Sequence, residues 1–310
     1  VLRDADIAMY RAKAAGKARY AVFDRSLHAE VSNRLRLEAD LRHAIAQGQL
    51  AVVYQPLVEL EGNRLVGFEA LARWNHPEQG PIGPDVFIPV AEESGLIVGL
   101  TDLVLKRACD QLRQWQLIDE SFADLRIQVN LSGRDVAQAG LTGRISQALL
   151  GAGLQAQHLT LELTENILME RLETALPMLE ELRGLGVRLS VDDFGTGYSS
   201  LAHLSTLPID SLKVDRSFVR NLSAGSKEAM VVRGIVQLGQ SLGKDVVAEG
   251  IETASQFDQL RGMGCRLGQG FLMARPMSAE RITALLVGQQ PWTGGVALPV
   301  ALNPLATQLH

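Results

Sequence analysis

Features that define several large classes of protein are scarce or absent in this sequence. Its two cysteines, Cys109 and Cys265, are far apart and lack metal-type spacing, so neither a disulfide framework nor a zinc site is expected. No apolar run reaches the roughly 18 residues of a membrane span, and no signal-peptide pattern is present. The net charge of -5 argues against a broad basic surface for duplex nucleic acid. We therefore expect a cytoplasmic chain without membrane contact of its own, although a longer parent with an upstream membrane anchor is compatible with it.

Strand-like and helix-like segments alternate through most of the chain. Its composition, 46% hydrophobic and 21% charged, is that of an ordinary globular protein. Apolar patterning predicts strands near 51–58, 64–73, 124–131, 158–164, 186–192, 209–215, 245–249 and 265–272. It predicts helices at 97–117, 133–151, 173–185, 226–242 and 253–263. Eight strands in about 240 residues are typical of a (β/α)8 TIM-like barrel. An open doubly wound sheet is the alternative, but no glycine-rich dinucleotide fingerprint supports it.

One connection departs from the regular alternation. Only Glu61-Gly62-Asn63 separates the first two predicted strands, so they should form a hairpin, with the first strand antiparallel. Before this α/β barrel we expect a linker helix at 26–48, and we place the barrel itself at 49–290. The remaining segment, 291–310, carries no motif and is expected to be a tail.

Polar residues recur on one face of the predicted strands. Leu159, Leu161 and Leu163 alternate with polar side chains, and other strands repeat the pattern. A sheet face exposed to water would explain this alternation, but intervening helices favour a polar face turned into the barrel. The polar residues expected at or near the C-terminal strand ends are Glu69, Asn130, Glu162, Asp192, Asp193, Lys213, Glu249 and Gln269.

Two adjacent carboxylates, Asp192 and Asp193, end an apolar run and precede a loop that contains Gly195 and Gly197. Adjacent carboxylates repel each other, so both stay ionised at a buried strand end only beside a cation. A turn that merely caps a helix would also explain this stretch when it is considered alone. Together with the other converging carboxylates, however, it favours a functional site over a structural core. Oxygen ligands of this kind predict Mg²⁺ or Mn²⁺ as cofactor.

Eight short motifs, in order along the chain, carry a resemblance to a known family. They are Tyr54-Gln55-Pro56, Glu69-Ala70-Leu71-Ala72-Arg73-Trp74, Val129-Asn130-Leu131-Ser132, Glu162-Leu163-Thr164-Glu165, the segment from Asp192 to Ser200, Leu212-Lys213-Val214-Asp215, Ala248-Glu249-Gly250-Ile251-Glu252 and Gln269-Gly270-Phe271. Over roughly residues 35–288 the chain resembles EAL-domain cyclic-di-GMP phosphodiesterases. One departure is visible, since Arg266 stands where many relatives have Asp.

The resemblance implies roles for these residues. The implied ligands of two divalent cations, with Asp192 as the bridge, are Glu69, Asn130, Glu162, Asp192, Asp193 and Glu249. The implied catalytic residues are Lys213, which bonds the attacking water, Glu249, which assists as a base, and Glu69. The implied substrate-binding residues are Gln55, Arg73, Asp215 and Gln269. The implied reaction is hydrolysis of cyclic-di-GMP to linear 5′-pGpG by a water that the two metals activate.

The resemblance also implies an assembly and leaves a second function open. Glu165 is expected to anchor the loop after Asp193, beside the contact of a homodimer that gates activity. The alternative function is a non-catalytic cyclic-di-GMP receptor that signals to a protein partner, but the presence of every ligand and base position favours the enzyme. Residues 1–25 resemble the C-terminal end of a GGDEF (diguanylate cyclase) domain without its signature loop. We therefore expect the chain to be a fragment of a longer protein.

Overall fold

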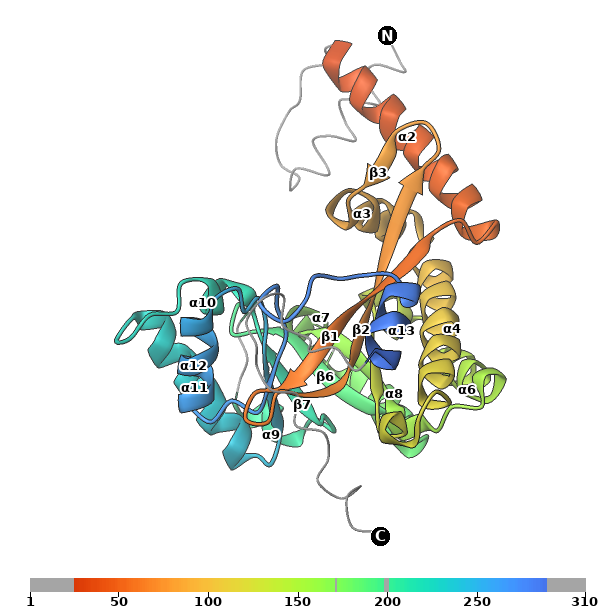
Figure 1. Ribbon diagram of the computed structural model, residues 1–310. Helices are drawn as coiled ribbons and strands as arrows, with labels where there is room; N and C mark the ends of the chain where they lie inside the picture. Colours follow the sequence, from red (N-terminus) through yellow and green to blue (C-terminus); the bar gives the residue numbers. More distant parts are fainter. Residues whose placement is uncertain (1–24, 171, 198–200, 289–310) are drawn as a thin grey trace. The chain divides into compact units, whose positions relative to one another are not determined.

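The computed structural model describes residues 25–170, 172–197 and 201–288, which belong to two compact units (Figure 1). One unit combines the chain up to Leu50 with Trp74–Leu100, and the other combines Ala51–Arg73 with the chain from Thr101 onward. Residues 1–24 of the GGDEF-like segment and the predicted tail lie outside the described residues.

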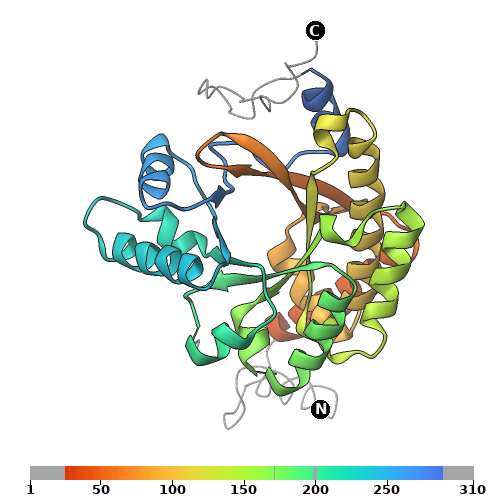
Figure 2. The same ribbon diagram turned by 90° about the horizontal axis from the view of Figure 1, so that it is seen from below.

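The larger unit is a closed, eight-stranded barrel (Figure 2). Around the ring the strands are β1 (Ala51–Glu59), β9 (Leu267–Gly268), β8 (Asp245–Ala248), β7 (Ser211–Val214), β6 (Arg188–Phe194), β5 (Leu159–Thr164), β4 (Arg126–Asn130) and β2 (Arg64–His76). Pairing of β2 with β1 closes the ring. Strand β1 is antiparallel to both of its neighbours, β2 and β9, and the other pairs around the ring are parallel. The predicted TIM-like barrel with an antiparallel first strand is therefore confirmed.

Helices surround the ring of strands (Figure 2). They are α4 (Ile97–Gln116), α5 (Gly133–Ala137), α6 (Leu141–Ala152), α7 (Glu165–Glu170), α8 (Leu172–Gly184), α9 (Leu201–Thr206), α10 (Arg216–Arg220), α11 (Lys227–Ser241), α12 (Ala254–Gly262) and α13 (Ala279–Val287), with short 3-10 turns at Glu120–Phe122 and Ala156–His158. They cover the apolar outer face of the strands, on which Leu159, Leu161 and Leu163 are buried. In the part of the chain that the structure describes, no helix is long and apolar enough to cross a membrane.

Three predicted elements differ from the observed ones. The predicted helix 133–151 is two helices, because Gly140 adopts a left-handed backbone conformation with φ of 88° between them. The predicted strand 265–272 contains only two paired residues. After Gly268 the chain leaves the sheet and crosses the loop that contains Ile251. The two backbones are so close that a Cβ added at Gly270 would lie 2.2 Å from backbone atoms of Ile251. Strand β2 is longer than predicted, because Trp74–His76 pair with β3 (Gly80–Ile82).

The smaller unit contains α2 (Arg25–Ala46), α3 (Pro84–Ser94), the end of β2, β3 and the first turn of α4. Its core includes Leu41 of α2 and an edge-to-face contact between Trp74 and Phe87, whose ring centroids are 6.1 Å apart. Ion pairs of Arg34 with Glu93 and of Arg36 with Glu78 join α2 to the rest of this unit.

We predict that neither cysteine reacts with Ellman's reagent in the folded protein. Cys109 and Cys265 are buried, and burial raises the pKa of each thiol to about 12, so almost no thiolate is available near neutral pH. Absorbance at pH 8 should show no released chromophore on the time scale on which glutathione reacts completely. In guanidinium chloride both thiols should react. Release of one equivalent from the folded chain would contradict the buried placement.

Candidate active site

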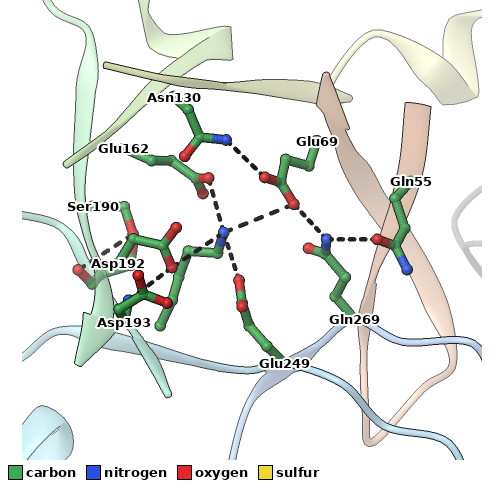
Figure 3. Close-up of polar contacts among 11 residues, drawn as sticks. Gln55, Glu69, Asn130, Glu162, Ser190, Asp192, Asp193, Glu249 and Gln269 are labelled. Carbon is green, nitrogen blue, oxygen red and sulfur yellow. Dashed lines mark hydrogen bonds and ion pairs between the residues drawn. The ribbon is translucent and has the colours of Figure 1, made fainter. Parts of the chain in front are cut away.

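Inward-facing side chains meet at the end of the barrel toward which the parallel strands run (Figure 3). Asn130 is the last residue of β4, Lys213 is next to last in β7, and Glu249 directly follows β8. Glu69 lies within the long strand β2 rather than at its end. Its pairing with β4 stops at Ala70, however, so Glu69 is at the mouth of the barrel although its strand continues beyond it.

The ammonium group of Lys213 is the centre of this cluster. Its Nζ lies 2.6 Å from Glu249 Oε1 and 2.8 Å from Glu162 Oε2. It also lies 3.5 Å from Asp192 Oδ1 and 3.8 Å from Glu69 Oε2. The side chains of Lys213 and Glu162 are almost completely buried. One buried cation therefore faces carboxylates from β2, β5, β6 and the end of β8.

A chain of amide groups extends the cluster toward β1. Asn130 Nδ2 donates to Glu69 Oε1 at 2.8 Å, and Gln269 Nε2 donates to the other oxygen of the same carboxylate. Gln269 Nε2 also donates to Gln55 Oε1 at 3.1 Å, and Gln55 Nε2 donates to the carbonyl of Ala274 at 3.2 Å. Gln55 and Glu69 are direct partners in the antiparallel β1–β2 pair, which places them side by side.

Three carboxylates on one side of the mouth form a second grouping. Oxygens of Asp192, Asp193 and Glu249 lie within 4.8 Å of one another, as a metal ion would require. Asp193 has a φ of 54°, in the left-handed region that non-glycine residues rarely adopt. Its backbone N–H donates to Asp192 Oδ1 at 2.9 Å. This turn brings two consecutive side chains, which would alternate on a regular strand, to the same end of the barrel.

Burial and mutual repulsion raise the pKa values of Glu249, Glu162 and Asp193. Burial raises the pKa of Glu249 to about 8, against the opposing effect of Lys213. Burial also raises the pKa of Glu162 far above its usual range, and the charges of Glu69 and Asp192 add to this. For Asp193, burial and then the charge of Asp192 raise the pKa to about 6. One lysine is therefore too little positive charge for the ionised cluster.

Lys213 itself remains charged. Burial opposes its charge, but Glu162, Glu249, Glu69 and Asp192 together raise its pKa well above the usual range. Its ammonium group is consequently a permanent part of the site at physiological pH.

The remaining predicted residues lie beside this network. Asp215 caps α10 by accepting from the Ser217 backbone N–H at 2.9 Å, and its charge contributes to the raised pKa of Asp193. Arg73 follows Glu69 on the same face of β2, and its Nη1 donates to the carbonyl of Ala72 at 2.8 Å. None of the ion pairs within the described residues joins Arg73 to the carboxylates.

Glu165, the predicted loop anchor, is buried at the start of α7. Its Oε2 accepts from the backbone N–H groups of Gly195 at 2.8 Å and Gly197 at 3.4 Å. A Cβ added at Gly197 would come within 2.8 Å of the Glu165 carboxylate, so this close approach requires glycine. The carboxylate thus contacts the described part of the loop after Asp193. Residues 198–200 of that loop lie outside the described residues.

The donor set fits hard divalent cations. Carboxylate and amide oxygens converge, and buried Glu162 Oε1 and Gln269 Oε1 have no hydrogen-bond partner among the described residues. Neither a histidine nor a cysteine belongs to the cluster of acidic side chains in the described chain. Oxygen donors of this kind suit a hard divalent cation.

Four further residues have positions that bear on the site and were assigned no role from the sequence. Ser190 and Ser211 lie one inward position below Asp192 and Lys213, and their hydroxyl groups are 2.9 Å apart. Strand alternation identifies both as inward-facing but gives no reason to assign them a function.

Phe271 lies two residues after Gln269 and is 46% exposed, with the Arg275 guanidinium 4.2 Å from its ring centroid. The exposed aromatic ring in the Gln-Gly-Phe motif is the signal that could have identified it.

The fold and the site together define a TIM-like barrel protein with an acidic site, suited to divalent cations, at its C-terminal mouth. Within this class the chain belongs to the EAL domain family, whose sequence profile matches residues 38–276. The predicted family is therefore confirmed.

Relatives of known name support this membership. The chain is 45% identical over 281 residues to the bifunctional diguanylate cyclase/cyclic di-GMP phosphodiesterase MucR of Pseudomonas aeruginosa, covering 91% of this chain and 41% of that protein. It is 43% identical over 286 residues to the cyclic di-GMP phosphodiesterase NbdA of the same organism, covering 92% of this chain and 36% of NbdA. The chain thus spans about two fifths of the length of these relatives.

A solved structure is similar along nearly its whole length. The PaMucR phosphodiesterase in complex with c-di-GMP superposes with a TM-score of 0.76 and 46% sequence identity. The match covers 80% of this chain and 99% of that one.

We predict that Lys213→Met destabilises the metal-free protein by roughly 3 kcal/mol, because it leaves buried carboxylates without their cation. Urea denaturation in EDTA, followed by circular dichroism, measures the loss. Lys227→Met, at an exposed position of α11, is the matched control and should change stability by less than about 0.5 kcal/mol. Equal stability of both variants would contradict the central role of the Lys213 charge.

Proposed function

We propose that the chain is a cyclic-di-GMP phosphodiesterase that requires divalent cations and releases linear 5′-pGpG. The observation that carries the proposal is the buried cluster around Lys213, in which several carboxylates share one ammonium and Glu162 Oε1 has no partner. Such a cluster gains little for the fold, because a buried ion pair seldom repays its desolvation. Its value is in binding cations and a substrate.

Two groups of residues would hold the cations. Glu69, Asn130, Glu162 and Asp192 would form one set of ligands, and Asp192, Asp193 and Glu249 would form the other. When bound, Mg²⁺ or Mn²⁺ would lower the pKa of a coordinated water and neutralise charge on the substrate phosphodiester. Without added positive charge, an anionic dinucleotide would meet a surface of like charge.

The side chains of the protein would orient the reaction. Lys213 has three N–H donors, which fix the carboxylates of Glu162 and Glu249 and would also donate to the attacking water. Glu249, whose Oε1 lies 2.6 Å from Lys213 Nζ, would accept the proton of that water. Linear 5′-pGpG follows when attack at one of the two phosphodiesters opens the ring.

Substrate contacts would come from the rim of the mouth. Gln55 and Gln269 offer amide groups beside Glu69, and Gln269 Oε1 is a buried acceptor without a partner among the described residues. Arg73 suits a phosphate because its guanidinium forms paired hydrogen bonds, and Asp215 can accept from the edge of a guanine. The exposed ring of Phe271 offers a face on which a base can stack.

The relatives favour the enzyme over a receptor that binds without cleaving. MucR and NbdA are both named as cyclic di-GMP phosphodiesterases, and the PaMucR structure contains c-di-GMP. This chain retains an oxygen or amide ligand at every predicted metal position, together with Lys213. A receptor would bind cyclic-di-GMP with the same contacts but yield no pGpG, so product analysis separates the two functions.

We predict that Asp192→Asn abolishes hydrolysis while substrate binding persists, because it removes the charge shared by both groups of ligands. Chromatography of cyclic-di-GMP incubated with Mg²⁺ or Mn²⁺ should show pGpG for the unmodified chain and at least about 100-fold less for the variant. Asp258→Asn on the exposed face of α12 is the control. Ca²⁺ should permit binding but suppress turnover, since it is larger and geometrically less demanding. Near-normal turnover of Asp192→Asn would refute the two-cation assignment.

The proposal includes a homodimer that gates activity. Glu165 connects α7 to the loop after Asp193 through Gly195 and Gly197, so a partner subunit that moves this loop would displace Asp193. Displacement by a fraction of an ångström is enough to lower the rate, because metal-assisted attack depends on close alignment. A two-fold contact beside this loop would therefore couple assembly to the second group of ligands.

We predict that Glu165→Ala lowers specific activity about 10-fold or more and weakens the dimer, with the first group of ligands unchanged. Glu170→Ala, in the same short helix but exposed, is the matched control. Specific activity against protein concentration, with sedimentation on the same samples, provides the measurement. Full activity of a purely monomeric sample would rule out the gating dimer.

A further inference from the structure

A second charged layer closes the opposite end of the barrel. Strands β4, β6 and β8 begin with Arg126, Arg188 and Asp245, four positions before the residues that each strand contributes to the mouth. Side chains four positions apart in a strand point to the same face. These three side chains therefore also point into the barrel, about 13 Å below the mouth. The same alternation that gathers carboxylates at one end thus gathers guanidinium groups at the other.

Positive charge at this end is only partly neutralised. Asp245 pairs with Arg266 Nη1 at 2.6 Å and with Arg188 Nη2 at 3.5 Å, so both of its oxygens are engaged. Arg126 forms no ion pair with any described residue. Burial and then the positive charge of Arg188 lower the pKa of Arg126, while the carboxylates of Asp245 and Asp124 oppose this effect. Arg266 also pairs with Glu59 Oε1 at 3.5 Å, whereas the guanidinium of Arg126 has no ion pair with a described residue.

A polar recess lies between this layer and the middle of the barrel. It has a volume of about 20 Å³ and is lined on its polar side by Arg126, Gln128, Thr160, Arg188, Ser211 and Asp245. Gln128 is only 4% exposed, and its buried Oε1 has no hydrogen-bond partner among the described residues. Asp245 also lines an open cleft of about 800 Å³, whose other charged lining residues are Lys244, Arg261, Arg266, Glu59 and Glu61. The recess has room for an oxygen atom of the size of water, and the cleft has room for a larger group.

We propose that this end of the barrel binds a phosphate group between Arg126 and Arg188. Guanidinium groups present paired N–H donors that match phosphate oxygens, and such charge-assisted bonds are stronger than hydrogen bonds between neutral groups. A protonated phosphate oxygen that enters the recess can donate to Gln128 Oε1 and accept from the hydroxyl of Thr160 or Ser211. The ligand is free phosphate or the phosphate of a small ester whose organic part occupies the cleft.

This site is independent of the proposed hydrolysis. It lies at the opposite end of the strands, uses none of the residues assigned to cations or substrate, and its test measures binding alone. EDTA in the buffer prevents the acidic mouth from recruiting phosphate through divalent cations, so a failure here leaves the phosphodiesterase proposal untouched.

Isothermal titration calorimetry with inorganic phosphate and with ribose 5-phosphate tests the proposal. The unmodified chain should show one saturable site that weakens with added salt. Arg126→Gln should weaken phosphate binding about 10-fold or more, the effect expected for loss of a charge-assisted hydrogen bond. Arg281→Gln removes the same charge from the exposed side of α13, and binding should stay within about 2-fold.

Arg126→Lys keeps the charge and provides a second variant if the glutamine variant does not fold. It should also weaken binding, because it loses the paired geometry. Tighter binding of ribose 5-phosphate would identify an ester as the ligand, and tighter binding of inorganic phosphate would identify the free anion. Absence of saturable phosphate binding, or equal affinity of Arg126→Gln and the unmodified chain, would overturn the proposal.

Discussion

The charge of Lys213 is the interaction on which the mouth of this barrel depends. Its ammonium group attracts carboxylates from β2, β5, β6 and the end of β8, which would otherwise repel one another. The side chains of these strands therefore converge on one atom rather than splay apart. Because the lysine supplies only one charge, the same arrangement leaves an excess of negative charge that suits divalent cations.

The reversed first strand positions the other side of the site. A parallel β1 would need a long crossover before β2, whereas the short hairpin after Glu59 sets Gln55 directly beside Glu69. Gln269, which follows the very short strand β9, then reaches both side chains. Gln269 thus shares a hydrogen-bond network with Glu69 and Gln55, which lie 200 and 214 positions away in the sequence.

Strand alternation in the sequence predicts most of the candidate site, because it fixes which side chains face inward. It predicts that Glu162, Asp192 and Lys213 meet at the mouth, and the structure brings them together. It cannot predict that Lys213 would be the common partner, since that depends on side-chain conformations in three dimensions. Nor can it predict the pairing of Trp74–His76 with β3, which extends β2 beyond the barrel.

The inward-facing positions at the starts of the strands are a different case. Arg126 and Arg188 obey the same alternation as the mouth residues, so the sequence places them inside the barrel. That Arg126 forms no ion pair with a described residue is not visible in the sequence, however, because it depends on which guanidinium reaches the carboxylate of Asp245. Packing decides this, and periodicity carries no information about it.

The left-handed backbone of Asp193 affects how substitutions at this position are to be understood. Alanine there would remove the carboxylate and, at a φ of 54°, would also strain the main chain. Glycine would relieve that strain but free the loop in the unfolded and folded states alike. Asparagine adopts the left-handed region readily and matches the shape of aspartate, so it alone isolates the contribution of the charge. The genetic code places asparagine one base away from aspartate, which makes loss of this charge with the backbone intact an easily reached natural variant.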